Sequence, residues 1–473
     1  MNREQIVKNI QSRYIILMPN GKEKELDLNN QEKVIEILNN LEDEELKLYI
    51  KAEELNIHSN KEPPSIKAMR QQELVDYESA SDLGNFRLYP KGQFVFDMLK
   101  DWVDEIAKNK LNAMQIDSPI IYDWNDKEIR EQASSFHERH YVVKVPNDEN
   151  KEFILRFAGD FGLFKIMKQA IFSYKMLPLR IYEFSKSFRY EKSGELSGLK
   201  RLRAFHMPDI HCFCKGVEEG WEEYQYLYRS YDDLANNSGI KYAVVFRIVE
   251  EFYEQHRERI IELLKYSNRP AFIEILSDMK HYWAVKHEFQ AIDSVSGNVQ
   301  LSSVQLDVKD AGIYGINYVN RDGNKKGCVI VHSSIGSIER WLYSILEDAF
   351  KKEKPQLPLW LSPIQVRLIP ISKAHIDYCK QLQINGVRVD IDDSDDSLGK
   401  KIAKSQKDWI PYVCIIGDKE IKSGELRVNL RNNEKKEMSI KELEDEIKIK
   451  CENMPYRPIP VPKELSKRPI FFG

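Results

Sequence analysis

Residues 188–214, FRYEKSGELSGLKRLRAFHMPDIHCFC, combine several side chains that could do chemistry. The segment predicts a strand, a loop and a returning strand, and side chains alternate between the two faces of a strand. Arg189 and Glu191 therefore share one face of the outgoing arm. One face of the returning arm carries Arg203, Phe205, Met207, Asp209 and His211. A guanidinium, an aromatic ring, a carboxylate and an imidazole in one row indicate a polar site for a phosphate, a flat base and a small polar ligand.

A second candidate segment is IGSIERW, residues 335–341. Gly336 lets the backbone approach a ligand, and a helix is predicted to begin there. Apolar side chains follow the helical period at Ile338, Trp341, Leu342, Ile345 and Leu346. Arg340 lies off that stripe, one turn into the helix, and helix N-termini attract anions.

These two segments resemble motifs 2 and 3 of the class II aminoacyl-tRNA synthetases. The first is most similar to the threonyl-tRNA synthetases, whose pattern runs FR-x-E, a glycine-containing loop, R-x-R-x-F and D-x-H-x-F-C. The resemblance implies that ATP, with Mg²⁺, is bent over threonine and that the amino-acid carboxylate attacks the α-phosphorus. Such a reaction depends on positioning and charge stabilisation more than on covalent chemistry by the protein.

The resemblance also assigns roles at the nucleotide. Arg189 would contact the α-phosphate and the attacking carboxylate, a task that suits a planar, bidentate cation. Glu191 would accept a hydrogen bond from the adenine amino group, and Phe205 would stack on the ring. Arg201 would reach the outer phosphates, and Arg340 would hold the γ-phosphate. The alternative is that these arginines are surface ion-pair partners.

Residues 300–308, QLSSVQLDV, resemble the family's VQLD strand. By that resemblance Gln305 lines the threonine pocket, while Gln300 and Ser303 approach the nucleotide. Met207 stands where bacterial relatives carry a glutamine near the substrate carboxylate.

Residues 282–289, YWAVKHEF, resemble the family's Y-G-P-K-x-E-F segment. Trp283 would take the tyrosine position of the substrate pocket, and Lys286 would be the lysine beside the reaction centre. Ala284 and Val285 replace the glycine and the proline, so the backbone path here departs from the family's pattern.

The resemblance further implies one catalytic Zn²⁺, held in the family by a cysteine and two histidines. A metal that requires the substrate hydroxyl as a ligand rejects valine, which an apolar pocket separates poorly from threonine. Here Asp160 takes the cysteine position, His211 matches one ligand, and His332 is the third, in a segment one residue shorter than usual. Asp209 would accept from the substrate hydroxyl. Without a metal, Asp160 would be a polar core residue and His211 a hydrogen-bonded core histidine.

Other candidates have simpler interpretations. His137 and His140 stand three residues apart but have no third ligand nearby in sequence, which favours surface or interface residues over a metal pair. Cys212 and Cys214 fall on the face opposite His211 and are predicted to be packed thiols.

Bulk properties limit the class of protein. The chain has 473 residues, 42% of them hydrophobic, which suggests two or three domains. With 71 basic and 75 acidic residues there is no overall cationic field, so any RNA-binding patch must be local. Six scattered cysteines, no signal peptide and no apolar run of about 18 residues predict a soluble, cytoplasmic enzyme that does not enter membranes.

The predicted organisation has three parts: a small N-terminal module over residues 1–60, a catalytic domain over 61–355 and a C-terminal domain over 356–473. Strands at 14–18 and 23–28 and helices at 31–39 and 43–55 are expected in the first part. By resemblance, the catalytic domain is α+β, an antiparallel sheet flanked by helices. Alternating strands and helices predict a C-terminal α/β domain with a mainly parallel sheet.

The resemblance extends to assembly and tRNA. Pro119 after Ser118 matches the motif 1 proline, which lies at the homodimer interface in the family; an ordinary turn proline is the alternative. The C-terminal domain resembles the anticodon-binding domain of the threonyl, prolyl, histidyl and glycyl enzymes. By position, the residues expected to read the single-stranded anticodon of tRNA(Thr) are Glu420, Arg427, Asn429 and Arg431.

No two histidines stand four residues apart, so the HxxxH pair of the family's editing domain is missing from this sequence. The chain resembles archaeal threonyl enzymes that have no editing domain, which implies that a separate protein removes mischarged serine in trans. Two alternatives stay open: a catalytically inactive, synthetase-like RNA-binding paralogue, and a synthetase for another small amino acid such as proline or serine.

Overall fold

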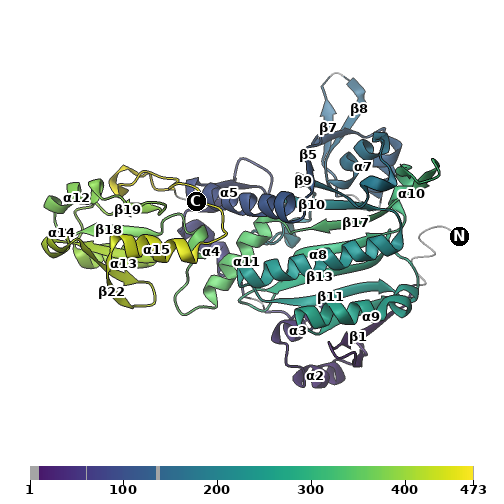
Figure 1. The fold of residues 1–473 in the computed structure, drawn as a ribbon, viewed down its shortest axis with the longest axis horizontal. Helices are drawn as coiled ribbons and strands as arrows, with labels where there is room; N and C mark the ends of the chain where they lie inside the picture. The colour runs from purple at the N-terminus through teal and green to yellow at the C-terminus, as the bar shows by residue number, and fades with distance from the viewer. Residues whose placement is uncertain (1–9, 60, 135–138, 147, 472–473) are drawn as a thin grey trace. The chain divides into compact units, whose positions relative to one another are not determined.

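The computed structural model describes residues 10–59, 61–134, 139–146 and 148–471. The chain divides into two compact units (Figure 1). The first comprises Met1–Glu62 and Val103–Ser344, and the second comprises Pro63–Trp102 and Ile345–Gly473. This division differs from the predicted boundaries, because the segment after residue 62 belongs with the C-terminal unit.

A ten-stranded sheet forms the first unit, in the order β2-β1-β12-β11-β13-β14-β17-β10-β9-β5. Its strands are β1 Ser12–Leu17, β2 Glu23–Leu26, β5 Met114–Ile116, β9 Leu179–Phe188, β10 Ala204–Cys214, β11 Tyr242–Val249, β12 Ala271–Leu276, β13 Trp283–Ile292, β14 Asn298–Asp307 and β17 Val329–Ser334. Only the β11–β12 and β5–β9 pairs are parallel. The predicted antiparallel sheet is therefore confirmed from β11 to β9.

Two long helices, α8 (Val217–Ser238) and α9 (Glu250–Ser267), lie across one face of this sheet (Figure 1). From α8, the hydroxyl of Tyr224 lies 2.9 Å from Nδ1 of His287, and that of Tyr231 lies 2.8 Å from Oγ of Ser333. Since adjacent strand residues point to opposite faces, the neighbours of His287 and Ser333 point away from these helices.

We predicted a small N-terminal module appended to the catalytic domain. The strands of this segment instead extend the large sheet. β1 pairs with β12 from Ser12↔Leu276 to Leu17↔Ala271, and β2 pairs with β1. Helices α2 (Gln31–Asn39) and α3 (Glu44–Tyr49), the latter continued by a π-helical turn Ile50–Glu54, bury Leu38, Leu46 and Tyr49 in a core with Phe272. The segment covers what would be an unpaired edge of β12.

Smaller elements complete the first unit. They are β6 Ile121–Asp123, α6 Lys127–Ser134, β7 Val142–Val145, β8 Asp148–Leu155, α7 Asp160–Gln169, α10 Asp310–Tyr314, β15 Asn317–Val319 and β16 Lys325–Gly327. Helix α11 (Ile338–Phe350) begins where predicted, after Gly336. Among the described residues, no helix is both long and apolar enough to cross a bilayer.

The second unit contains a five-stranded sheet in the order β19-β18-β20-β21-β22. Its elements are α4 Ser65–Gln71, β3 Val75–Tyr77, β4 Phe86–Leu88, α5 Pro90–Glu105, β18 Val366–Pro370, α12 Ile376–Gln381, β19 Val389–Ile391, α13 Leu398–Lys407, β20 Tyr412–Ile416, α14 Asp418–Ser423, β21 Glu425–Leu430, β22 Lys435–Ser439 and α15 Ile440–Lys450. β18 is parallel to β19 and β20, but β21 and β22 run antiparallel. The sheet is thus mixed rather than mainly parallel, because a short hairpin joins β21 to β22 without a crossover helix.

A buried ion pair fixes the centre of the second unit. Arg367 on β18 donates from Nε and Nη2 to the two oxygens of Asp390 on β19, both at 2.9 Å. Both side chains are almost fully buried, so removing one partner leaves an uncompensated charge in the core.

We expect Asp390→Asn to lower the free energy of unfolding by about 3–5 kcal/mol, measured by urea denaturation followed by circular dichroism. Asp395→Asn, which disrupts an exposed pair with Lys373, is the matched control and should cost at most about 1 kcal/mol. Equal effects of the two substitutions would contradict the role of burial.

Candidate active site

The predicted site residues meet because four adjacent strands are in register. Lys286 on β13 lies opposite Gln305 on β14, Gln305 lies opposite His332 on β17, and His332 lies opposite His211 on β10. One row across the sheet therefore carries an ammonium, an amide and two imidazoles. The row lies on the face opposite α8, since His287 and Ser333 occupy the other face.

The next row on the same face places Ser303, Ser334 and Asp209 side by side. The hydroxyl of Ser185 donates to Oδ2 of Asp209 over 3.3 Å. Burial, which outweighs the nearby His211, raises the pKa of Asp209 to about 6, and Asp160 contributes in the same direction. Asp209 lies beside His211 as predicted, with its carboxylate held by a neighbouring strand.

The three predicted metal ligands lie together. Asp160, in the first turn of α7, has its Oδ1 at 3.2 Å from Nε2 of His211. One donor atom from each of Asp160, His211 and His332 lies within 4.8 Å of the others. Burial alone would raise the pKa of Asp160, but the hydrogen bond with His211 and the nearby His332 lower it to about 2. Two imidazoles and an ionised carboxylate at this spacing form a donor set that suits a transition-metal ion.

A second carboxylate orients His332. Oδ2 of Asp307 lies 2.7 Å from Nε2 of His332, while its Oδ1 accepts from the backbone N–H groups of Lys309 and Asp310. Burial lowers the pKa of His332, but Asp307 more than compensates and raises it to about 9. Asp307, Asp310 and His332 also form a group with donor atoms within 4.8 Å. Asp307 was not among the predicted site residues, although its place in the VQLD strand was a usable signal.

Two arginines form a cationic region on the same unit. Arg189 donates from Nε to the carbonyl of Phe157 over 3.0 Å, and its guanidinium lies 5.2 Å from the ring centre of Phe205. Arg340 donates from Nε to the carbonyl of Lys200 over 3.2 Å. Burial and the positive charge of Arg189 lower the pKa of Arg340 to about 10, so it is still a cation at neutral pH.

Glu339 ties the start of α11 to β10. Its carboxylate accepts from the backbone N–H of His206 at 3.0 Å, lies 2.8 Å from Nδ1 of the same residue, and accepts from the hydroxyl of Ser337 at 2.7 Å. The neighbouring Arg340 is therefore positioned by a direct link between the two segments first recognised in the sequence.

The loop between β9 and β10 carries an ion-pair network. Arg201 lies 2.9 Å from Glu191 and 3.0 Å from Glu195, and Arg139 lies 3.4 Å from Glu191. Arg203 donates to the backbone carbonyl of Glu191 at 2.7 Å, so it shapes the loop. Arg201 thus contacts Glu191 here, and its reach to the outer phosphates stays a prediction.

Tyr282, which was not among the predicted site residues, contacts the row of site side chains, whereas Trp283 was the aromatic residue assigned to the pocket by resemblance. The hydroxyl of Tyr282 donates to Oε1 of Gln305 over 2.8 Å, and its ring centre lies 5.2 Å from that of His332. Trp283 instead stacks on His281 at 4.8 Å. Counting back by twos from Lys286 places Ala284 and Tyr282 on its face, which agrees with the contact between Tyr282 and Gln305. The pairing of β13 with β14 is irregular between Trp283 and Val285.

Lys286 ends a chain of polar contacts that starts in the N-terminal strand. The hydroxyl of Ser12 donates to Glu274 over 2.8 Å, and Arg247 joins Glu274 at 3.1 Å to Glu288 at 2.8 Å. Glu288 contacts the ammonium of Lys286 at 2.5 Å. Burial would raise the pKa of Glu288, but Lys286 and Arg247 lower it to about 2, so the carboxylate stays ionised. This chain of polar contacts holds Lys286 in its row.

Comparison with known proteins agrees with this geometry. The tRNA synthetase class II core domain (G, H, P, S and T) matches residues 141–349, and the anticodon binding domain matches residues 365–450. Threonine–tRNA ligases of Pyrococcus furiosus and Pyrococcus horikoshii are each 42% identical over 425 residues, which cover 87% of this chain and 67% of theirs. The chain belongs to the threonine–tRNA ligase family.

Solved structures agree on the fold. The RNA binding domain of threonyl-tRNA synthetase from Cryptosporidium parvum superposes with a TM-score of 0.72 at 22% identity, covering 84% of this chain and 99% of that one. Prolyl-tRNA synthetase from the same organism, complexed with halofuginone and AMPPNP, gives a TM-score of 0.66 at 18% identity, covering 80% and 75%. The predicted class II core and anticodon-binding domain are thus confirmed for this member of the threonine–tRNA ligase family.

The predicted anticodon residues divide into two pairs. On β21, Arg427 is exposed and Asn429 is half-buried, and both lie on one face of the strand. Glu420 is buried and accepts from the backbone N–H of Gly417 over 2.9 Å, which caps α14. Arg431 is buried and donates to the carbonyls of Pro355 and Gln406 at 2.6 and 2.8 Å. The latter two side chains bind backbone groups of the protein, and contact of all four residues with the anticodon stays a prediction.

The remaining candidates have structural roles or fall outside the description. Cys212 and Cys214 are buried thiols, as predicted. The ring of His140 packs 4.8 Å from that of Phe157, and His137 lies outside the described residues.

The Tyr282 hydroxyl gives a direct test of the substrate pocket. We expect Tyr282→Phe to raise KM for threonine about 2- to 10-fold, because it removes one hydrogen bond to Gln305 worth about 0.5–1.5 kcal/mol and keeps the ring. KM for ATP should not change. The measurement is threonine-dependent ATP–pyrophosphate exchange with each substrate varied in turn. Tyr266→Phe, which removes an exposed hydroxyl contact to Asp233, is the control. An unchanged KM for threonine would contradict a role of the Tyr282 hydroxyl in the threonine pocket.

Proposed function

We propose that this chain activates threonine with ATP to form threonyl-adenylate and transfers the threonyl group to tRNA(Thr). The observation that carries the proposal is the row Lys286, Gln305, His332 and His211 on the open face of the sheet, with Asp209 in the next row. The row gathers donors and acceptors for a small amino acid, and the family membership supplies the reaction class.

In this proposal the two arginines bind the triphosphate from two directions. Arg189 contacts the α-phosphate and the attacking carboxylate of threonine, and Arg340 holds the γ-phosphate. Phe205, already under the Arg189 guanidinium, supports the adenine ring beside Glu191. Arg201, Gln300 and Ser303 complete the nucleotide contacts. As the carboxylate oxygen bonds to the α-phosphorus and pyrophosphate leaves with Mg²⁺, these fixed cations stabilise the charge that moves onto the phosphates.

The amino acid lies over the row of side chains. Gln305 and Tyr282 border the side chain of threonine, Asp209 accepts from its hydroxyl, and Met207 lies near its carboxylate. Asp160, His211 and His332 would hold one zinc ion, and Asp307 would fix the orientation of His332. A metal held there supplies a Lewis acid that needs the substrate hydroxyl as a ligand and so separates threonine from valine.

Family membership also supports a homodimer, with Pro119 at its interface, and a cytoplasmic location. Arg427 and Asn429 are the side chains we propose for the anticodon. Removal of mischarged serine by a separate protein stays a prediction, tested by the rate at which the pure enzyme hydrolyses Ser-tRNA(Thr).

One observation favours a second candidate, an RNA-binding paralogue without activation chemistry. The metal group has Asp160 where the family pattern places a cysteine. Threonine-dependent ATP–pyrophosphate exchange separates the two functions. Exchange that occurs with threonine, and does not occur when proline or serine replaces threonine, supports the ligase.

Arg340 tests the nucleotide site. We expect Arg340→Ala to reduce kcat for threonine-dependent exchange about 100- to 1,000-fold, the usual cost of losing one fixed charge-stabilising group. Arg259→Ala, which removes a partly exposed guanidinium paired with Glu218, is the matched control and should retain full activity. Exchange at the unaltered rate in Arg340→Ala would rule out the proposed γ-phosphate contact.

Metal content tests the three-residue group independently of activity. We expect about one zinc per chain by inductively coupled plasma mass spectrometry, and a roughly 10- to 100-fold loss of metal affinity in Asp160→Asn. Asp126→Asn, which alters a surface pair with Lys165, should keep its metal. If the unaltered protein contains no stoichiometric metal after purification and zinc addition, the metal site is disproved.

A further inference from the structure

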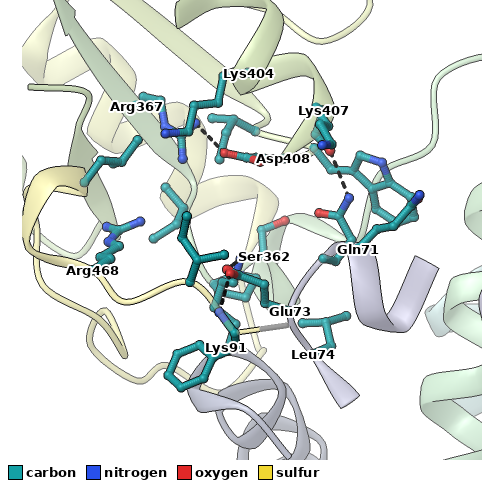
Figure 2. A pocket seen from close by; sticks show the side chains of 18 of the residues that line it. Gln71, Glu73, Leu74, Lys91, Ser362, Arg367, Lys404, Lys407, Asp408 and Arg468 are labelled. Carbon is teal, nitrogen blue, oxygen red and sulfur yellow. Dashed lines mark hydrogen bonds and ion pairs between the residues drawn. The ribbon is translucent and has the colours of Figure 1, made fainter. Parts of the chain in front are cut away.

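The second unit contains a pocket that the proposed reaction does not use (Figure 2). Its volume is about 520 Å³, within the range of small-molecule sites. The walls come from the end of α4, the end of α13, the segment before β18, and the C-terminal tail over residues 465–471. All of these segments belong to the second unit, whereas Arg189 and Arg340 belong to the first.

Basic side chains outnumber acidic ones in the lining. It includes Arg70, Lys91, Arg367, Lys404, Lys407 and Arg468, against the acidic Glu73 and Asp408. Most of these charges are compensated inside the protein, as in the pairs Lys91–Glu73 at 2.8 Å, Arg367–Asp408 at 2.7 Å, Arg468–Asp390 at 3.0 Å and Arg70–Asp76 at 2.7 Å. Both acidic residues of the lining, Glu73 and Asp408, already form ion pairs with basic residues. An anion that enters the pocket would therefore not be repelled by an unpaired carboxylate of the lining.

Lys404 and Lys407 are the exceptions. Both side chains are exposed, and within the described ranges neither forms an ion pair. The backbone carbonyl of Lys407 accepts from Nε2 of Gln72 over 2.9 Å, which holds this end of α13 at the pocket. Basic residues commonly complement the negative end of a helix, and that accounts for lysines in this turn. It does not account for the hollow that they border.

The rest of the wall is apolar and aromatic. Leu74, Leu357 and Ile410 are buried, and Trp409 and Phe471 are half-buried. Trp409 has a φ of 55°, in the left-handed region that bulky residues rarely adopt and that clusters at functional sites.

The tail over residues 465–471 is fixed at its end. The N–H of Phe471 donates to Oε1 of Glu73 over 3.0 Å, and its ring stacks on Tyr89 at 5.1 Å. The pocket therefore has an anchored apolar wall on one side and two uncompensated ammonium groups on the other.

We propose that this pocket binds a nucleotide, with its base against Trp409 and its phosphate on Lys404 and Lys407. Base–aromatic stacking and a phosphate–ammonium contact are the two interactions that such a lining supplies, and both tolerate any base. The occupant is either a free mononucleotide or one nucleotide of an RNA strand. The site does not depend on the proposed ligase activity, because none of its residues takes part in activation.

Photocrosslinking to the full chain locates the occupant. The probe is an azido derivative of adenosine monophosphate, azido-AMP, and the labelled peptides are identified by mass spectrometry. We expect label in peptides covering residues 404–410 or 465–471, in addition to peptides from the ATP site of the first unit. Label confined to the first unit overturns the proposal.

Matched variants assign the contacts. We expect the double variant Lys404→Glu/Lys407→Glu and the variant Trp409→Gly each to reduce labelling of the pocket about tenfold, with the first-unit label unchanged. Glycine adopts positive φ without strain, so Trp409→Gly removes the ring and keeps the backbone path. Lys400→Glu, on the same helix beside Asp396, is the control. Equal labelling in all three variants overturns the proposal.

Two further arms separate the sources and the functions. If the occupant belongs to RNA, excess unmodified tRNA transcript suppresses the pocket label and Lys404→Glu/Lys407→Glu weakens tRNA binding; if it is a free nucleotide, tRNA leaves the label unchanged. Threonine-dependent exchange is measured on the same preparations. Pocket labelling without exchange would contradict the proposed ligase activity and support the nucleotide site. Exchange without pocket labelling would support the ligase activity and contradict the nucleotide site.

Discussion

The site depends on one constraint, the register of four antiparallel strands. β13, β14, β17 and β10 bring Lys286, Gln305, His332 and His211 into a single row. Because strand side chains alternate with a period of two, a slip of one residue in any strand would turn its member of the row toward α8. Register is in turn fixed by the opposite face, where residues such as His287 and Ser333 bind tyrosines of α8. The packing of the helix layer and the chemistry of the open face are consequences of the same alignment.

Charge at the site is held in place by partners outside the row. Asp307 orients His332, Glu339 positions the turn that carries Arg340, and the chain of polar contacts from Ser12 through Glu274, Arg247 and Glu288 reaches Lys286. The N-terminal strands therefore extend the sheet and also support an ion-pair chain that ends at a proposed catalytic residue. The Nε groups of Arg189 and Arg340, by contrast, each donate to a backbone carbonyl.

Local patterns predicted much of the fold, and the candidate site residues came from the family resemblance. The alternation in the returning arm predicted β10 and the face shared by Asp209 and His211, and the helical stripe predicted α11. The prediction for the outgoing arm was wrong, because β9 ends at Phe188 and leaves Arg189 and Glu191 in the loop that follows. The family resemblance assigned Trp283 to the pocket, whereas it is Tyr282 that donates to Gln305. The β21–β22 hairpin makes the second sheet mixed rather than mainly parallel. The contacts of Glu420 with Gly417, and of Arg431 with Pro355 and Gln406, could not be predicted, because nothing in their sequence context indicates them.

The sequence by itself determined which residue types are present, which strand faces they share, and which family the motifs resemble, because alternation and helical period are properties of a single chain segment. Only the tertiary structure decided which faces meet. It joined Asp160 to His211 and His332 across long stretches of chain, added the N-terminal strands to the catalytic sheet, and enclosed the pocket between α13 and the tail. Those outcomes follow from strand pairing and close packing between segments distant in sequence, and such contacts leave no periodic signal in either segment alone.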